Sequence, residues 1–190
     1  MTNMMEVPSD LPRPEDDGAA DNLTGMKFPE ITLKSTSGES VNTSSLTQGI
    51  TVIYCYPKTG RPDEEMPKGW DDIPGARGCT VQALDFSKKY NEFERRGVQV
   101  FGMSTQTTDY QKEMVNRLQV PFPILCDTNF TLTKLLKLPT FEVAGEVLLK
   151  RLTMIIKDGI IVKVFYPVFP PNEDAGEVLA WLDRESNSPR

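Results

Sequence analysis

The clearest hydrophobic pattern in the chain lies between residues 80 and 96. Apolar side chains recur there three or four positions apart, which places them on one face of a helix, and charged residues fill most of the other face. Gly97 follows at a position where helices commonly end. The pattern predicts a long amphipathic helix whose buried face carries Ala83, Phe86, Tyr90 and Phe93.

Short β-prone runs lie on both sides of this helix. Residues 28–33 alternate in polarity and lead through a turn to a second strand near 40–41, which predicts an N-terminal β-hairpin. Residues 51–56 form a compact β-prone run that is typical of a buried central strand. Further strands are expected at 98–103 and 122–126.

Three further helices are expected in the second half of the chain. Thr108 and Gln111 match a capping box that opens a helix. Residues 130–136 predict a short helix. Asn172 is a good capping residue for a final helix. The apolar face of that helix is expected to contain Ala175, Val178, Leu179 and Leu182.

The order of these segments predicts the fold class. Residues 146–156 and 160–165 are expected to form a hairpin that turns at 157–159. Alternating strands and helices, followed by a β-hairpin and a terminal helix, indicate an α/β protein of thioredoxin-like order, with a central mixed sheet flanked by helices. Residues 1–24 are rich in Pro and acidic residues and predict a mobile tail before one domain over 25–190.

Composition excludes several classes of function. A net charge of −6 without a basic cluster argues against nucleic-acid binding. No apolar run approaches the roughly 20 residues of a membrane span, and the N-terminus lacks the pattern of a secretory signal. There is no histidine, no glycine-rich phosphate loop and no pair of closely spaced thiols, so neither a metal nor another cofactor is expected. Three widely spaced cysteines favour a reduced, cytoplasmic protein.

Cys79 stands out because it lies at the start of the long helix, after a glycine- and proline-rich turn. Unpaired N–H groups and the positive end of the helix dipole favour an anion at that position. A cysteine there is placed to ionise, and Arg77 is close to it in sequence. The alternative is a buried structural thiol, which is the favoured interpretation for Cys55 and Cys126 in their apolar strands.

Arg151 is the second unusual residue, because it interrupts an otherwise apolar predicted strand. An unpaired buried charge is costly, so a buried arginine needs a partner such as a thiolate. The alternative is an ordinary charge on an edge strand, and the pattern alone leaves both interpretations open.

Four blocks of sequence in this order resemble a peroxiredoxin, and most of all the bacterioferritin-comigratory, or Q-type, branch of that family. The resemblance covers roughly residues 26–185. The blocks are Tyr56-Pro57-Lys58, Gly78-Cys79-Thr80-Val81-Gln82-Ala83, Phe122-Pro123-Ile124-Leu125-Cys126-Asp127, and residues 151–159.

The resemblance implies a thiol-dependent peroxidase. Cys79 resembles the peroxidatic cysteine, which attacks hydrogen peroxide or an organic hydroperoxide and becomes a sulfenic acid. Arg151 resembles the arginine that stabilises the thiolate and the peroxide. Gln82 stands where Q-type members usually carry a glutamate and is expected to orient Arg151 or the active-site turn. Such relatives imply a monomer or small homodimer and an external reductant, namely thioredoxin, glutaredoxin or glutathione.

The chain departs from the family pattern just before Cys79. The family carries Pro-x-x-x-Thr-x-x-Cys there, but Asp72 and Ala76 occupy the Pro and Thr positions of this chain. Either Pro57 and Thr59 or the backbone N–H groups of the turn near Pro74 are expected to replace the missing groups.

A second departure is Leu84, which occupies the position of the resolving cysteine that many Q-type members carry. A one-cysteine enzyme is therefore the favoured interpretation, with Cys55, Cys126 or a partner's cysteine as alternative resolving thiols. Two other functions stay open: a peroxide sensor or redox relay, and a non-catalytic thioredoxin-fold binding module.

Overall fold

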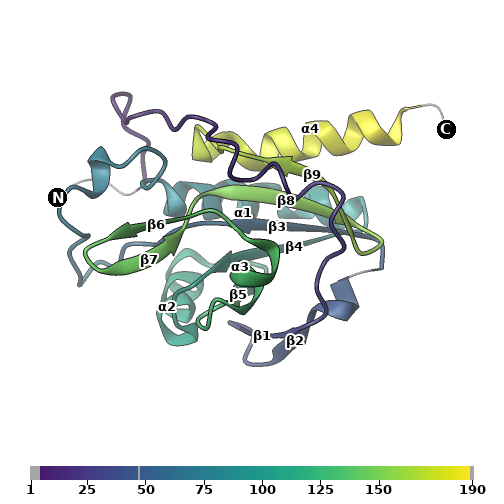
Figure 1. The fold of residues 1–190 in the computed structure, drawn as a ribbon, viewed down its shortest axis with the longest axis horizontal. Helices are drawn as coiled ribbons and strands as arrows, with labels where there is room; N and C mark the ends of the chain where they lie inside the picture. The colour runs from purple at the N-terminus through teal and green to yellow at the C-terminus, as the bar shows by residue number, and fades with distance from the viewer. Residues whose placement is uncertain (1–4, 47, 189–190) are drawn as a thin grey trace.

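A seven-stranded mixed sheet forms the centre of the protein in a computed structural model that describes residues 5–46 and 48–188 (Figure 1). A separate two-stranded sheet contains β6 (Thr140–Val143) and β7 (Glu146–Leu149). The large sheet runs in the order β2 (Ser40–Asn42), β1 (Thr32–Ser35), β5 (Ile124–Cys126), β4 (Val98–Ser104), β3 (Ile50–Cys55), β8 (Leu152–Lys157) and β9 (Ile160–Phe165).

The middle of the sheet is β3, which pairs in parallel with β4 and antiparallel with β8. Residues 51–55 are all buried, because helices or other segments cover both faces of the sheet at this point. That burial explains why this strand lacks the polar alternation of a half-exposed strand. The predicted N-terminal hairpin is present as β1 and β2, although the first strand begins at Thr32 rather than at residue 28.

Helices cover both faces of the sheet, as predicted for this fold class. The core on one face combines residues of α1 (Cys79–Arg95), α2 (Thr108–Leu118) and α4 (Asp174–Ser186). The core on the other face includes residues of α3 (Thr131–Leu136). None of the helices in the described residues has the length and apolar character needed to cross a membrane.

Two predicted helix starts were wrong by one or two residues. The side chain of Thr107, rather than Thr108, accepts the N–H of Tyr110 and caps α2. Asn172 does not cap the last helix, because it lies exposed in a 3-10 turn (Pro171–Glu173) and α4 begins at Asp174.

The predicted strand over 146–156 is broken in the structure. Its first part, β7, pairs with β6, whereas its second part, β8, pairs with β3 and β9. The break falls at Lys150 and Arg151, which belong to neither strand. The chain changes partners there, so Arg151 lies where two sheets meet.

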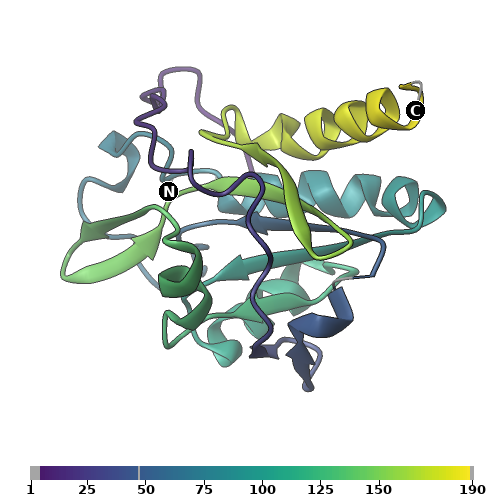
Figure 2. The same cartoon turned by 45° about the vertical axis from the view of Figure 1, so that its right-hand side comes forward.

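The N-terminal segment lies against the body of the protein and crosses the sheet on its way to β1 (Figure 2). Asp17 forms an ion pair with Lys150 and accepts a hydrogen bond from Tyr166, and these contacts hold the pKa of Asp17 well below its usual range. Leu23 is fully buried in the core. The composition of residues 1–24 predicts a mobile tail, so these contacts were not expected. The domain boundary after residue 24 stays a prediction.

Candidate active site

Cys79 is the first residue of α1, and a glycine precedes it. Gly78 has a φ of 115°, in the left-handed region that disfavours side chains. A Cβ atom at this position would lie 2.3 Å from Cγ of Pro171, so glycine is also required by the space available. This close approach places the thiol at the start of α1, directly beside the turn that leads into α4.

The guanidinium of Arg151 contacts the Cys79 sulfur directly. Its Nη2 lies 3.2 Å from Sγ, and Cys79 and Arg151 are only 4% and 3% exposed. The same Nη2 donates to the carbonyl oxygens of Ala76 at 3.0 Å and Gly75 at 3.3 Å. Arg151 is therefore a buried partner of the thiol rather than a charge on an edge strand.

Gln82 joins this arrangement from the next turn of α1. Its Oε1 accepts a hydrogen bond from Nη1 of Arg151, and its Nε2 donates to Oδ2 of Asp174 at 2.7 Å. The structure thus brings Gln82 to Arg151, as the sequence predicts for an orienting residue.

Asp174 is a site residue that the sequence alone does not reveal. It is 2% exposed, and burial raises its pKa to about 6 although Thr153, Gln82 and Arg151 favour its charged form. An aspartate at the start of a helix usually stabilises the helix end. In the sequence, Asp174 lies between the predicted cap Asn172 and the apolar residues of the last helix. An acid at such a position is usually exposed to solvent, so the sequence does not mark Asp174 as a site residue.

Thr59 does not share a hydrogen bond with Cys79 in the described part of the chain. It is buried, its N–H donates to Gln106 at 3.1 Å, and its carbonyl accepts from Tyr110 at 2.9 Å. Its place is therefore in the base of the long loop. The turn near Pro74 contacts the site through the carbonyl groups of residues 75 and 76, which hold Arg151, and this differs from the N–H groups expected from the sequence.

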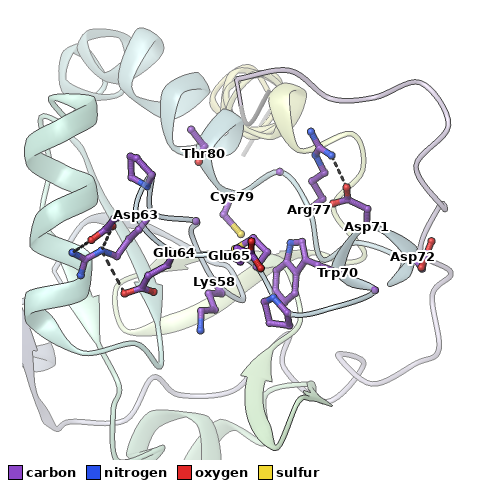
Figure 3. Close-up of a pocket in the computed structure, with 17 residues that line it drawn as sticks. Lys58, Asp63, Glu64, Glu65, Trp70, Asp71, Asp72, Arg77, Cys79 and Thr80 are labelled. Carbon is purple, nitrogen blue, oxygen red and sulfur yellow. Dashed lines mark hydrogen bonds and ion pairs between the residues drawn. The ribbon is translucent and has the colours of Figure 1, made fainter. Parts of the chain in front are cut away.

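The long loop over residues 57–78 encloses a cavity of about 910 Å³ that Cys79 also lines. Trp70 is buried against Phe141, with 6.2 Å between ring centroids, and holds the loop to the β6–β7 sheet. Figure 3 shows Cys79 among the charged side chains of this cavity. These are the acids Asp63, Glu64, Glu65, Asp71 and Asp72 and the bases Lys58, Arg61 and Arg77.

The other two cysteines are buried thiols. Cys55 belongs to the core on the face of the sheet opposite to Cys79, and burial raises the pKa of its thiol. Burial also raises the pKa of Cys126, whose sulfur accepts a hydrogen bond from Gln111. All three cysteines are free thiols in this structure. A direct bond between Cys55 and Cys79 is excluded in this conformation, because the sheet separates them.

Comparison with known proteins identifies the family. The model of the Redoxin family matches residues 23–179. The chain belongs to the Redoxin family. Chloroplastic peroxiredoxin Q of rice (Oryza sativa subsp. japonica) is 27% identical over 158 residues, which are 83% of this chain and 65% of the rice protein. The chain thus spans a little less than two thirds of the length of that relative. The match confirms the predicted resemblance to Q-type peroxiredoxins.

Solved structures agree with the fold of this Redoxin-family protein. Peroxidoxin BcpB from Mycobacterium tuberculosis superposes with a TM-score of 0.71 at 24% identity, and the match covers 87% of this chain and 99% of that one. A cysteine-to-serine mutant of PrxQ from Xylella fastidiosa gives a TM-score of 0.69 at 18% identity and covers 96% and 100%. The predicted thioredoxin-like fold is thereby confirmed.

Proposed function

We propose that this protein is a thiol-dependent peroxidase that reduces hydrogen peroxide or organic hydroperoxides through Cys79. The observation that carries the proposal is the buried Arg151 guanidinium, whose Nη2 lies 3.2 Å from the Cys79 sulfur at the start of α1. A guanidinium and a helix N-terminus both stabilise a thiolate, which is the nucleophilic form of cysteine.

The first step oxidises the sulfur. The thiolate of Cys79 attacks one oxygen of the peroxide, so that an S–O bond forms while the O–O bond breaks. The departing oxygen takes the proton that the thiol gave up and leaves as water or an alcohol. Negative charge spreads over sulfur and both oxygens in the transition state, and the donors of Arg151 are placed to stabilise it.

The second step needs a reductant from outside the chain, with thioredoxin, glutaredoxin and glutathione as candidates. One external thiol attacks the sulfenic sulfur, releases water and forms a mixed disulfide. A second thiol then attacks that disulfide, which restores Cys79 and leaves the reductant oxidised. Cys55 and Cys126 are poor candidates for this step because their surroundings favour the protonated thiol.

The volume of the cavity beside Cys79 is evidence for bulky as well as small peroxide substrates. A volume of about 910 Å³ is far larger than hydrogen peroxide needs and accommodates an organic hydroperoxide. The bacterioferritin comigratory protein of Xanthomonas campestris, a structural neighbour with a TM-score of 0.67 at 20% identity, has alkyl peroxide reduction activity. As part of the proposal, we extend that substrate class to this protein. The proposal also includes a cytoplasmic location and a monomeric or small dimeric state.

The contact between Arg151 and Cys79 weighs against one of the two alternatives, the non-catalytic binding module. Replacement of family residues by Asp72 and Ala76 would favour a non-catalytic binding module, but backbone carbonyl groups still hold Arg151 against the thiol. A peroxide sensor would use the same first step and differ only in passing the oxidation to a partner protein.

The test is steady-state consumption of hydrogen peroxide and cumene hydroperoxide by the full chain with dithiothreitol. Wild-type protein is expected to turn over many equivalents, and the Cys79→Ser variant none. A single turnover that stops while reductant remains would favour the sensor, and equal rates for both proteins would overturn the proposal.

A further inference from the structure

We infer that Asp174 is a positioning residue of this site, which acts on Cys79 through Gln82 and Arg151; the inference rests on the proposed peroxidase function. Three contacts link the four side chains in series. Oδ2 of Asp174 lies 2.7 Å from Nε2 of Gln82, Oε1 of Gln82 accepts from Arg151, and Nη2 of Arg151 lies 3.2 Å from Sγ of Cys79.

Asp174 determines which end of the Gln82 amide faces the arginine. A side-chain amide has a donor group at one end and an acceptor at the other. A carboxylate only accepts, so Asp174 requires the NH₂ group on its side and thereby turns the oxygen toward Arg151. With the amide reversed, two donors would face each other and the guanidinium would lose this partner.

Gln82 holds the Nη1 end of the guanidinium, whereas backbone groups hold the Nη2 end. In the described residues, its Nη2 donates only to two carbonyl oxygens of the turn before α1 and to the thiol, whereas its Nε has no partner. Gln82 supplies the only side-chain oxygen that Arg151 reaches there. Losing the orientation of Gln82 is therefore expected to leave Nη1 without its partner and to loosen the guanidinium against the sulfur, although the two carbonyl oxygens still accept from Nη2.

The two oxygens of Asp174 have different tasks. Oδ2 accepts from both Gln82 and Thr153 at 2.7 Å, whereas Oδ1 is buried without a partner in the described part of the chain. A proton added at Oδ1 leaves both hydrogen bonds in place. The orienting role thus depends on the acceptor atom rather than on the charge, and an asparagine with its oxygen at the Oδ2 position reproduces it.

Charged groups around Asp174 come from three sides. Arg151 favours its charged form, whereas Asp85 on α1 opposes it. Asp85 is itself paired with Lys89 and accepts the N–H of Ala175. From the sheet, Tyr54 and Cys55 are the titratable groups that interact electrostatically with Asp174.

The first test compares Asp174→Ala with Asp174→Asn in the full chain. Two rates are measured for each protein: oxidation of Cys79 by hydrogen peroxide and its alkylation by iodoacetamide, which reports thiolate reactivity without peroxidase chemistry. Asp174→Ala is expected to lower both rates by about tenfold or more, since the acceptor that orients the Gln82 amide is lost, whereas Asp174→Asn keeps an acceptor oxygen and loses about threefold or less. The control is Asp183→Asn, which removes an exposed acid of the same helix.

The second test uses Gln82→Glu. In the wild-type background this change places two carboxylates within hydrogen-bond distance, so it is expected to lower both rates. Combining it with Asp174→Asn is expected to restore them, because the NH₂ group of the introduced asparagine can donate to the new carboxylate, which still accepts from Arg151. Asp174→Asn is therefore expected to lower both rates slightly in the wild-type background and to raise them in the Gln82→Glu background.

Equal rates for Asp174→Ala and Asp174→Asn, or additive effects with Gln82→Glu, would overturn the inference. Circular dichroism checks the folding of every variant, and the Gln82→Glu pair decides the matter if Asp174→Ala does not fold. If the wild type fails to react with peroxide, the proposed function fails, whereas the alkylation rates still test the role of Asp174.

Discussion

Gly78 and Pro171 lie so close together that no other residue type fits at position 78: an added Cβ would lie 2.3 Å from the proline Cγ. Two segments that are far apart in sequence meet here, namely the turn before Cys79 and the turn before α4. The contact brings Asp174 within reach of Gln82, because it joins the start of α1 to the start of α4. The first prediction concerns this contact.

Gly78→Ala is expected to lower the free energy of unfolding by about 3 kcal/mol, since a left-handed φ and a steric clash act together. Gly97→Ala is the matched control, because Gly97 also has a positive φ but no neighbouring atom where a Cβ would lie. It should cost about 1 kcal/mol. Urea unfolding of both variants measures the difference, and equal costs would contradict the importance of Pro171.

Arg151→Lys is expected to lower the rate of peroxide reduction by about 100-fold, although it keeps the charge. An ammonium group cannot at once reach Gln82, the carbonyl groups of the turn and the sulfur in the way that the guanidinium does. The second-order rate constant with hydrogen peroxide measures the effect. A rate within about threefold of wild type would mean that charge alone is sufficient.

The stability of the protein is expected to fall as the pH rises from about 4 to about 6. The pKa of Asp174 is raised to about 6 by burial, from an ordinary value of 3.8, so the folded state binds this proton more tightly than the unfolded state. The contribution is complete below pH 4 and lost above pH 6, and it amounts to about 3 kcal/mol.

Thermal unfolding of the wild type and Asp174→Asn across this pH range isolates the contribution of Asp174. Asp17 has a lowered pKa and changes stability in the opposite direction, but it does so in both proteins. The difference between the two curves is therefore the quantity to compare. A difference that stays constant from pH 4 to pH 7 would contradict the raised pKa.

Cys55→Ser and Cys126→Ser are each expected to keep turnover with dithiothreitol close to the wild-type rate. Leu84 replaces the nearby resolving thiol, the other two thiols are buried, and Cys55 lies on the opposite face of the sheet from Cys79. Non-reducing mass spectrometry after peroxide treatment should show no intramolecular disulfide in the wild type. An internal disulfide of Cys79, lost in one of these variants, would show that the chain resolves its own sulfenic acid.

The parts of the structure that could be predicted are those that local pattern determines. The helix over 80–96 has a buried face set by its own period, and residues 51–56 have the pattern of a central strand because both of their faces are covered. Cys79 could be singled out by its place at a helix start, and the role of Arg151 by its resemblance to the family.

The parts that could not be predicted depend on contacts between distant segments. The break at Lys150 arises because β7 and β8 pair with different sheets, and the apolar pattern is the same on both sides of it. Asp174 has the pattern of an ordinary first-turn acid until its contact with Gln82 is seen. Thr59 is one of two alternatives that the sequence offers for the missing threonine, and in the structure its backbone is held by Gln106 and Tyr110 in the loop.

The most direct test of the central claim is intact mass after one equivalent of hydrogen peroxide in the presence of a sulfenic-acid trap. Wild-type protein is expected to gain one trap adduct within seconds, on Cys79, while Cys79→Ser gains none. An unmodified wild type after several minutes, or an adduct that persists in Cys79→Ser, would contradict the assignment of Cys79 as the peroxidatic residue.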